Sequence, residues 1–382
     1  MEPYFNSIEE EQEYLARRAR RKQRMIRERR RRQRRRLIIK LCLCLSVFSV
    51  LLVTCVSMFG KKSKNNKTGD QAEVNQTVIA EEHKPHTEPV SAAVEAEPVK
   101  QETKIYRFEE TEHTKNIYSE NVISTHAILV DESTDKIVAW KGAKERISPA
   151  SMTKVLTVLV AAEHITEEQL DDTFTMTIDI TDYSYVNDCS NVGFLVDEKI
   201  KVKDLFYGTI LPSGGDAAVG LATYVAGSHE AFVDLMNEKL QELGLSDTAH
   251  FTNCVGLYDK EHYCTLYDMA IIMKAAMEND LCREVLGTKC YTTEPTPEHS
   301  EGLIISNWFL RRIEDKDTCG EVLGAKTGFV AESGSCAVSY LMSENGTPYI
   351  CATAGSSSSW RCIYDHVEIY TKYVPGVTVG EP

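Results

Sequence analysis

Ser151 and Lys154 are the two residues of this sequence whose types and spacing most directly indicate chemistry. They stand three positions apart at the start of a segment with helical spacing of apolar residues, and positions i and i+3 of a helix share a face. A serine hydroxyl needs a base to become a nucleophile, and a lysine amine can be that base when burial lowers its pKa. Taken alone, S-x-x-K is also typical of an ordinary helix start followed by a solvated lysine.

Two later motifs carry groups that such a pair would need. Ser213 opens the segment SGGD, and its hydroxyl could relay a proton to a leaving group. The alternative interpretation of this segment is a turn followed by a helix N-cap. Lys326, Thr327 and Gly328 form K-T-G in a strand-like segment, where a cation beside a bare backbone offers a docking edge to a carboxylate.

The order and spacing of these motifs narrow the interpretation. S-x-x-K is followed by a serine 62 residues later and by K-T-G another 113 residues on, which is the ordered trio of the penicillin-recognising serine enzymes. The sequence resembles the D-alanyl-D-alanine carboxypeptidase family, the low-molecular-mass penicillin-binding proteins, over about residues 120–365. The matching segments are 127–131 (AILVD), 147–154 (ISPASMTK), 211–218 (LPSGGDAA), 250–257 (HFTNCVGL) and 326–334 (KTGFVAESG).

The resemblance implies a role for each matching residue. Ser151 would form an acyl-enzyme with Lys154 as general base, and Ser213 would pass the proton to the departing D-alanine. Lys326 and Thr327 would hold the terminal carboxylate, and Gly328 belongs to the same substrate-binding strand. The backbone N–H groups of Ser151 and Phe329 would form the oxyanion hole. It further implies that the substrates are peptidoglycan stem peptides ending in D-Ala-D-Ala, that β-lactams are covalent inhibitors, and that no metal or cofactor takes part.

One residue departs from the family pattern. The second motif is usually S-x-N, and here Gly215 stands where the asparagine is expected. The asparagine side chain helps to place the lysine and the substrate amide, so a water or another side chain must substitute or turnover suffers.

Other functions compete with the carboxypeptidase. A D,D-endopeptidase would use the same residues, and a weakly active or non-catalytic binder of muropeptides or β-lactams would fit the departure at Gly215. A class A β-lactamase would need an E-x-x-L-N loop, which is absent between residues 216 and 252.

Apolar periodicity predicts the elements that must position these residues. Apolar runs at 127–130 and 137–140 flank a polar turn, and runs at 337–342 and 349–354 flank Glu344-Asn345-Gly346, so both pairs indicate β-hairpins. Helical spacing covers 151–163 and is also indicated at 214–226, 229–243 and 266–279, the last opening with Thr265 and Asp268 in capping-box positions. We therefore expect an α+β domain of the β-lactamase/transpeptidase type. Strands from its two ends form one antiparallel sheet beside a helical cluster, and one transmembrane helix precedes the domain.

The charge distribution separates the N-terminal region from the rest. Residues 1–70 hold 19 Lys and Arg against 7 Asp and Glu, which leaves 24 basic and 50 acidic residues in 71–382. Such an acidic body would not neutralise phosphates, so nucleic-acid binding is disfavoured.

An apolar run at 37–59 predicts a membrane anchor. Its 23 residues would span about 35 Å as a helix at about 1.5 Å per residue. Fourteen of the twenty residues at 17–36 are Lys or Arg, which places the N-terminus in the cytoplasm and the catalytic domain outside. Readings as a nuclear-localisation tract, a cleaved signal peptide or a lipoprotein signal fit less well, because the basic block abuts the run and no A-x-A-like site follows it.

These features give the expected organisation of the chain. A basic cytoplasmic tail covers 1–36, the signal anchor 37–59, a disordered linker 60–115, the catalytic domain 116–370 and a short tail 371–382. Twelve cysteines divide into three in the anchor and nine beyond it. Because the nine are scattered and include no C-x-x-C pair, we expect most of them to be small buried apolar residues and not metal ligands.

Overall fold

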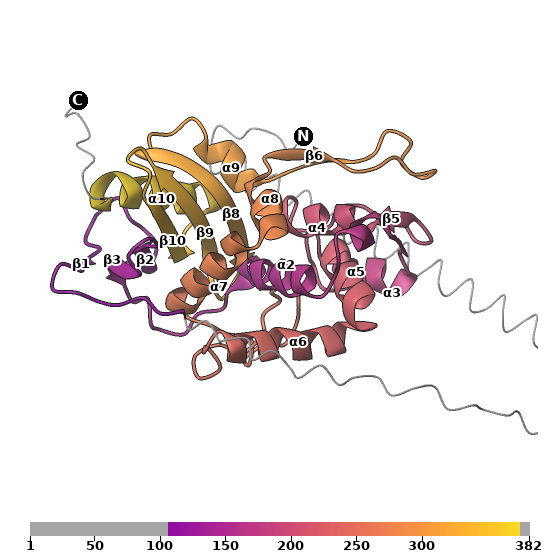
Figure 1. Ribbon diagram of the computed structural model, residues 1–382, viewed down its shortest axis with the longest axis horizontal. Helices are drawn as coiled ribbons and strands as arrows, with labels where there is room; N and C mark the ends of the chain where they lie inside the picture. The colour runs from indigo at the N-terminus through magenta and orange to yellow at the C-terminus, as the bar shows by residue number, and fades with distance from the viewer. Residues whose placement is uncertain (1–105, 375–382) are drawn as a thin grey trace, which may run out of the picture. The chain divides into compact units, whose positions relative to one another are not determined.

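The computed structural model describes residues 106–374, which are built around a six-stranded sheet (Figure 1). The strand order is β1-β3-β2-β10-β9-β8, and β2 near the start of the described chain pairs antiparallel with β10 near its end. The strands are β1 (Lys115–Asn116), β2 (His126–Asp131), β3 (Lys136–Lys141), β8 (Gly320–Val330), β9 (Gly334–Ser343) and β10 (Pro348–Ser356). The predicted meeting of terminal strands is confirmed. The antiparallel sheet is confirmed as well, and the two-residue β1, which was not predicted, pairs parallel with β3 at its edge.

Both faces of the sheet are covered, as the continuous apolar run of β2 requires. Residues 127–130 are all fully buried, and alternate ones enter two separate cores because successive strand side chains point to opposite faces. One core includes α7 (Leu266–Glu278) and α8 (Asp280–Gly287), and the other includes α9 (Trp308–Ile313) and α10 (Ser359–Tyr373).

Helix α2 (Thr153–Glu163) lies between the sheet and the helical cluster (Figure 1). Its residues 153–161 are buried on every side, so the helix is a central core element and not an amphipathic surface helix. The helices of the cluster are α3 (Ile178–Val186), α4 (Val202–Ile210), α5 (Gly215–Ala226) and α6 (His229–Glu242). The remaining short elements are η1 (Ala150–Met152), η2 (Glu168–Asp171), β4 (Thr173–Thr175), β5 (Lys199–Lys201), β6 (Cys290–Thr292) and β7 (Ile304–Ser306).

The elements expected from the sequence are found close to their predicted bounds. The two hairpins and the helices corresponding to α2, α5, α6 and α7 are present, and Thr265 and Asp268 form the predicted capping box of α7. Helix α10 was missed. Its buried positions recur at helical spacing, but they include cysteine, histidine and tyrosine, so hydropathy alone hides the pattern.

The folded part begins about ten residues earlier than the predicted boundary at residue 116. Phe108 is buried and its ring meets that of Tyr267 edge to face at 6.0 Å. The backbone N–H of Glu109 donates to Asp135 at 2.8 Å, and that of Ile137 donates back to Glu109 at 2.9 Å. These contacts place residues 106–115 on the domain, although they had been expected in the linker.

The predicted tail at 1–36, the anchor at 37–59 and most of the linker lie outside the described residues. Within 106–374, no helix combines the length and the apolar character needed to cross a bilayer. The described residues 106–374 fall within one compact unit, so we expect a fragment that contains them, residues 102–382, to fold by itself.

We expect Phe108→Ala to lower the free energy of unfolding of the 102–382 fragment by about 3–5 kcal/mol, because it leaves a cavity where an aromatic ring was buried. Urea unfolding followed by circular dichroism measures this. Glu112→Ala is the control, since that side chain is 87% exposed. Equal midpoints for the two variants would show that residues 106–115 do not belong to the domain.

Candidate active site

The nucleophile candidate lies at the entrance to the buried helix. Ser151 is in the short turn η1, and Lys154 is in the first turn of α2. The Lys154 Nζ donates to the Ser151 Oγ at 3.1 Å, so the pair predicted from the i, i+3 spacing is in contact. Ala150, just before the serine, has φ of 47°, a left-handed conformation that non-glycine residues rarely adopt. Such backbone strain is typical of functional sites, where it fixes the direction of a side chain.

The environment of Lys154 gives its amine the properties of a base. Only 1% of the residue is exposed, and its Nζ donates a second hydrogen bond to the backbone carbonyl of Val255 at 2.7 Å. Burial lowers the pKa of Lys154 from 10.5 to about 8, because removal from water penalises the charged form. A useful fraction of the amine is therefore neutral near physiological pH and can accept the serine proton.

Ser213 and Lys326 form a second hydroxyl–amine pair although they are 113 residues apart. The Lys326 Nζ donates to the Ser213 Oγ at 2.9 Å and to the Thr327 carbonyl at 2.7 Å. Lys326 is 2% exposed, and its pKa lies well below the ordinary value because of burial and the neighbouring charge of Lys154. Ser213, in the loop between α4 and α5, has φ of 61°, so both serines adjoin or occupy strained backbone.

Strand β8 brings K-T-G against the nucleophile. A methyl group on Gly328 would lie 2.9 Å from the Ser151 backbone nitrogen and 3.0 Å from the Ala150 Cβ, so only glycine permits this approach. Thr327 is half-buried and the Phe329 side chain is 68% exposed. Among the described residues β8 is the last strand of the sheet, so no further strand pairs with its outer edge and an extended peptide could approach it there.

Three polar residues that the sequence interpretation left without a role hold these groups in place. Asn253 Oδ1 accepts from the N–H groups of Val255 at 3.2 Å and Gly256 at 2.7 Å, which shapes the turn that presents the Val255 carbonyl to Lys154. His262 Nδ1 accepts from the Thr252 N–H at 3.0 Å, so its Nε2 carries the hydrogen and faces the Thr153 Oγ1 at 2.9 Å. Burial lowers the pKa of His262 to about 3, which keeps it neutral.

Asp216, the third of these residues, fixes the start of α5. Its carboxylate is 2% exposed and accepts from the N–H groups of Val192 at 2.9 Å and Gly193 at 3.1 Å. The loop after α3 is thereby tied to the SGGD motif. Burial raises the pKa of Asp216 above its ordinary value, although the backbone donors oppose this shift.

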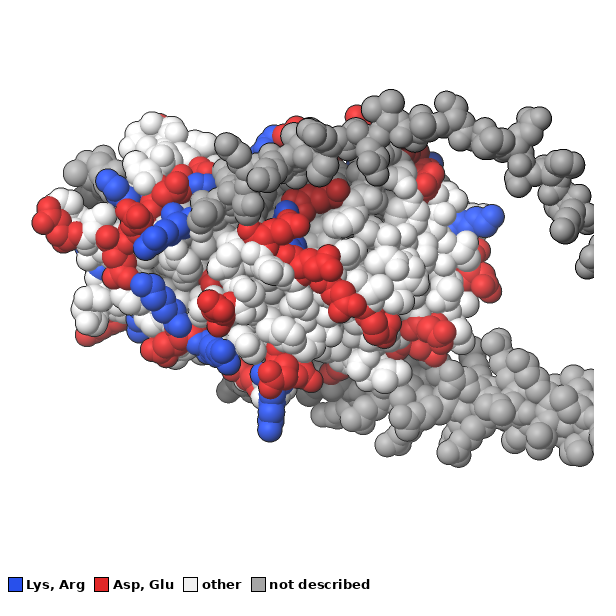
Figure 2. Space-filling view, turned by 60° about the horizontal axis from the view of Figure 1, so that its bottom comes forward, with Lys and Arg blue, Asp and Glu red and all other residues white. Residues whose placement is uncertain are grey.

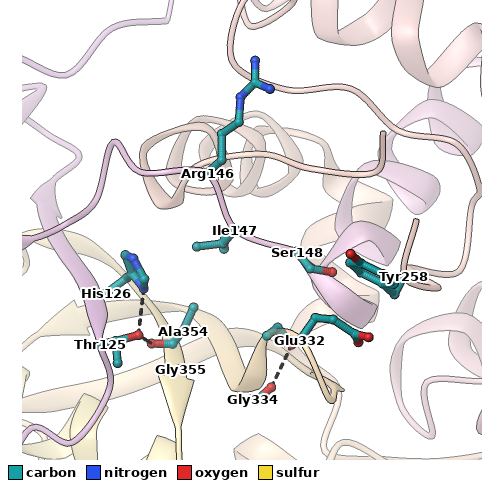
Figure 3. Close-up of a pocket in the computed structure, with 11 residues that line it drawn as sticks. Thr125, His126, Arg146, Ile147, Ser148, Tyr258, Glu332, Gly334, Ala354 and Gly355 are labelled. Carbon is teal, nitrogen blue, oxygen red and sulfur yellow. Dashed lines mark hydrogen bonds between the residues drawn. The ribbon is translucent and has the colours of Figure 1, made fainter. Parts of the chain in front are cut away.

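A hollow of about 500 Å³ adjoins the site at the far end of β8 (Figure 3). Its walls come from the segments before Ser151 and after β8, and they include Arg146, Ser148, Tyr258 and Glu332. Ser151, Lys154, Ser213 and Lys326 do not line it. The hollow therefore lies beside these four side chains, between the segment before Ser151 and the turn after β8.

The geometry defines a class of protein. A serine–lysine pair at the start of a buried helix, a second serine–lysine pair opposite it and a K-T-G edge strand constitute the site of a penicillin-recognising serine enzyme. The chain belongs to the D-alanyl-D-alanine carboxypeptidase family, whose model matches residues 110–357.

Individual relatives agree with this assignment. The chain is 31% identical over 211 residues to the D-alanyl-D-alanine carboxypeptidase DacF of Bacillus subtilis, covering 55% of this chain and 52% of that protein. It is 31% identical over 223 residues to a D-alanyl-D-alanine carboxypeptidase of Streptomyces sp. strain K15, covering 55% and 73%. The crystal structure of the Streptomyces K15 DD-transpeptidase superposes with a TM-score of 0.59 at 26% identity, covering 66% of this chain and 98% of that one. The chain thus spans about half the length of the Bacillus relative.

The lowered pKa of Lys154 can be tested by measuring how the free energy of unfolding depends on pH with and without this lysine. Between about pH 8 and 10.5 the unfolded lysine binds more protons than the folded one, so the free energy of unfolding rises with pH through this window. Relative to Lys154→Met, the unmodified fragment should therefore gain about 2 kcal/mol from pH 7 to pH 10.

Urea unfolding of both proteins across this range gives the difference, which cancels the titration of the groups that do not interact with Lys154. The exposed Lys136→Met is the control for loss of a lysine. A difference that does not change with pH would contradict the burial of a titrating amine.

Proposed function

We propose that this chain is a serine-type D-alanyl-D-alanine carboxypeptidase that removes the terminal D-alanine of peptidoglycan pentapeptides through an acyl-enzyme on Ser151. The observation that carries the proposal is the pairing of each buried lysine with one serine hydroxyl, at 3.1 Å and 2.9 Å, beside an edge strand. Family membership supports the same chemistry.

The proposed acylation uses the first pair. Ser151 Oγ attacks the carbonyl carbon between the two D-alanines while neutral Lys154 takes the hydroxyl proton. The backbone N–H groups of Ser151 and Phe329 stabilise the oxyanion. The C–N bond then breaks as Ser213 passes its proton to the departing amine and regains one from Lys154, which returns the proton it took from Ser151. An ester then joins the remaining peptide to Ser151, and Lys154 is neutral again. Water hydrolyses this ester and restores the hydroxyl.

Substrate orientation uses the second pair and the strand. Lys326, Thr327 and Gly328 on β8 receive the terminal carboxylate, and the peptide backbone pairs with the strand edge. A carboxylate at this point supplies the counter-charge that the desolvated Lys326 ammonium lacks in the free enzyme. A β-lactam presents the same carboxylate and a strained amide, and its leaving group stays tethered, so the ester persists.

The charge of the chain does not by itself attract a carboxylate. Residues 71–382 hold 50 acidic against 24 basic residues, and Figure 2 shows a face on which acidic side chains are widely spread, with basic side chains among them. An anionic peptide end therefore depends on groups within the site, above all Lys326.

Labelling and product release test the proposed function. In membranes containing the full chain, a fluorescent penicillin should label the protein covalently, and a pentapeptide ending in D-Ala-D-Ala should release D-alanine. Ser151→Ala should abolish both, and Lys154→Met should slow acylation by about 10²–10⁴-fold because it removes the general base. Ser148→Ala, three residues before the nucleophile, is the matched serine control.

The outcomes separate the competing functions. Labelling without release from the pentapeptide, but with cleavage of crosslinked peptides, would identify an endopeptidase. Labelling with neither activity would identify a binder, and unlabelled wild-type protein would refute the role of Ser151.

We also propose that residues 37–59 anchor the chain, with 1–36 in the cytoplasm and the domain outside, joined to the anchor by a linker. The 14 basic residues at 17–36 and the apolar run support this arrangement. Externally added protease should digest the penicillin-labelled domain of intact spheroplasts, and alkaline carbonate should not extract the chain. A protected domain, or one extracted by carbonate, would contradict the proposal.

A further inference from the structure

Gly215 stands where the second motif usually has an asparagine, but the space next to its Cα is occupied by other residues. A methyl group on Gly215 would lie 2.9 Å from the Cys189 Cβ, 3.4 Å from the Cys189 Sγ and 2.9 Å from the Ser184 Oγ. The first and last distances are too short for real contacts. A cysteine and a serine from another segment therefore stand where a side chain on residue 215 would begin.

Hydrogen bonds fix this segment against α5. The Gly215 N–H donates to the Ser190 carbonyl at 2.8 Å, and the Cys189 N–H donates to the Ser184 carbonyl at 2.9 Å. The buried Asp216 carboxylate holds the next two backbone N–H groups, those of Val192 and Gly193. The position of Cys189 is thus set by the same motif that provides Ser213.

The Cys189 thiol differs from the other cysteines of the domain. Of the nine cysteines within 106–374, seven are buried, as the sequence predicted, and all nine are outside disulfides. Cys189 and Cys290 are the two that retain exposure, and Cys290 lies on β6.

Two observations connect this thiol with the reacting groups. Cys189 lies close enough to Lys154 that its thiolate form raises the pKa of that amine against the effect of burial. Next to it, the Ser184 hydroxyl is fully buried without a hydrogen-bond partner and faces the same space. An unpaired buried hydroxyl at this point is costly, and it is explained if a ligand or the thiol uses it during the reaction.

We propose that Cys189 is a positioning residue of this active site, which takes the place of the second-motif asparagine and, together with Ser184, orients Lys154 and the substrate amide. This inference rests on the proposed function. A thiol is compact, polarisable and a weak hydrogen-bond donor, so it can contact both an amine and an acyl amide within the space that Gly215 leaves.

Acylation kinetics test this role in the full chain, solubilised in detergent. The second-order rate of labelling by a fluorescent penicillin is measured from pH 6 to 10 for wild type, Cys189→Ala, Cys189→Ser and Cys290→Ala. We expect Cys189→Ala to be slower by about tenfold or more, because the amine and the acyl group lose a positioning contact. Its ascending pH limb should shift to lower pH, because the group that raises the Lys154 pKa is gone.

The other variants distinguish positioning from packing. Cys189→Ser keeps a small hydrogen-bonding group and should recover most of the rate, and Cys290→Ala should match wild type. Normal labelling of wild type with an unchanged rate and pH profile in Cys189→Ala would overturn the positioning role alone. Unlabelled wild type would remove the proposed function and this role with it.

Reciprocal exchange of the two positions provides an independent test. Gly215→Asn alone should slow acylation, because its Cβ collides with Cys189, whereas Gly215→Asn combined with Cys189→Gly should recover it. A single variant as fast as wild type would show that residue 189 does not occupy the cleft.

Thiol protection gives a third readout. Iodoacetamide should modify Cys189 more slowly in penicillin-acylated protein than in free protein, while Cys290 reacts equally in both. Equal rates at Cys189 would place the thiol outside the acyl-binding cleft and contradict the inference.

Discussion

Two lysine side chains buried within one cleft are the constraint on which the rest of this structure depends. Each ammonium group loses its hydration, and the charge of Lys154 further disfavours that of Lys326, so both pKa values fall. The protein offsets the desolvation with one serine hydroxyl and one backbone carbonyl for each amine. In the proposed mechanism the two lysine–serine contacts also carry the proton transfers of acylation, so contacts that offset burial would serve the chemistry as well.

The fold supplies this arrangement because the cleft lies where a helix, a strand and a loop meet. The buried helix α2 provides Lys154, the edge strand β8 provides Lys326, and the α4–α5 loop provides Ser213. Strained backbone at Ala150 and Ser213 is tolerated because the surrounding core over-determines both positions. Since β8 has an unpaired edge and Gly328 lies against Ser151, a peptide that extends the sheet would bring its carbonyl to the nucleophile.

The helical side of the cleft shows how one motif residue can be exchanged without leaving a void. Asp216 and Gly215 tie the segment after α3 to the start of α5, and that segment contributes Cys189, while α3 itself contributes Ser184, to the space at residue 215. The departure from S-x-N is therefore a redistribution of side chains between two segments and not a simple deletion.

The sequence by itself determined the local relations. Ser151 and Lys154 share a face because helical geometry fixes residues three positions apart, and the hairpin at Asn345-Gly346 and the capping box of α7 are equally local. It also indicated that strands from both ends share a sheet. Tertiary structure alone decided the start of the domain at residue 106, helix α10, and the contact between Lys326 and Ser213. Tertiary structure also decided that Cys189 fills the space at Gly215 and that the pKa of Lys154 falls to about 8. Both depend on contacts between distant segments and on the loss of water, which arise only when these segments pack together.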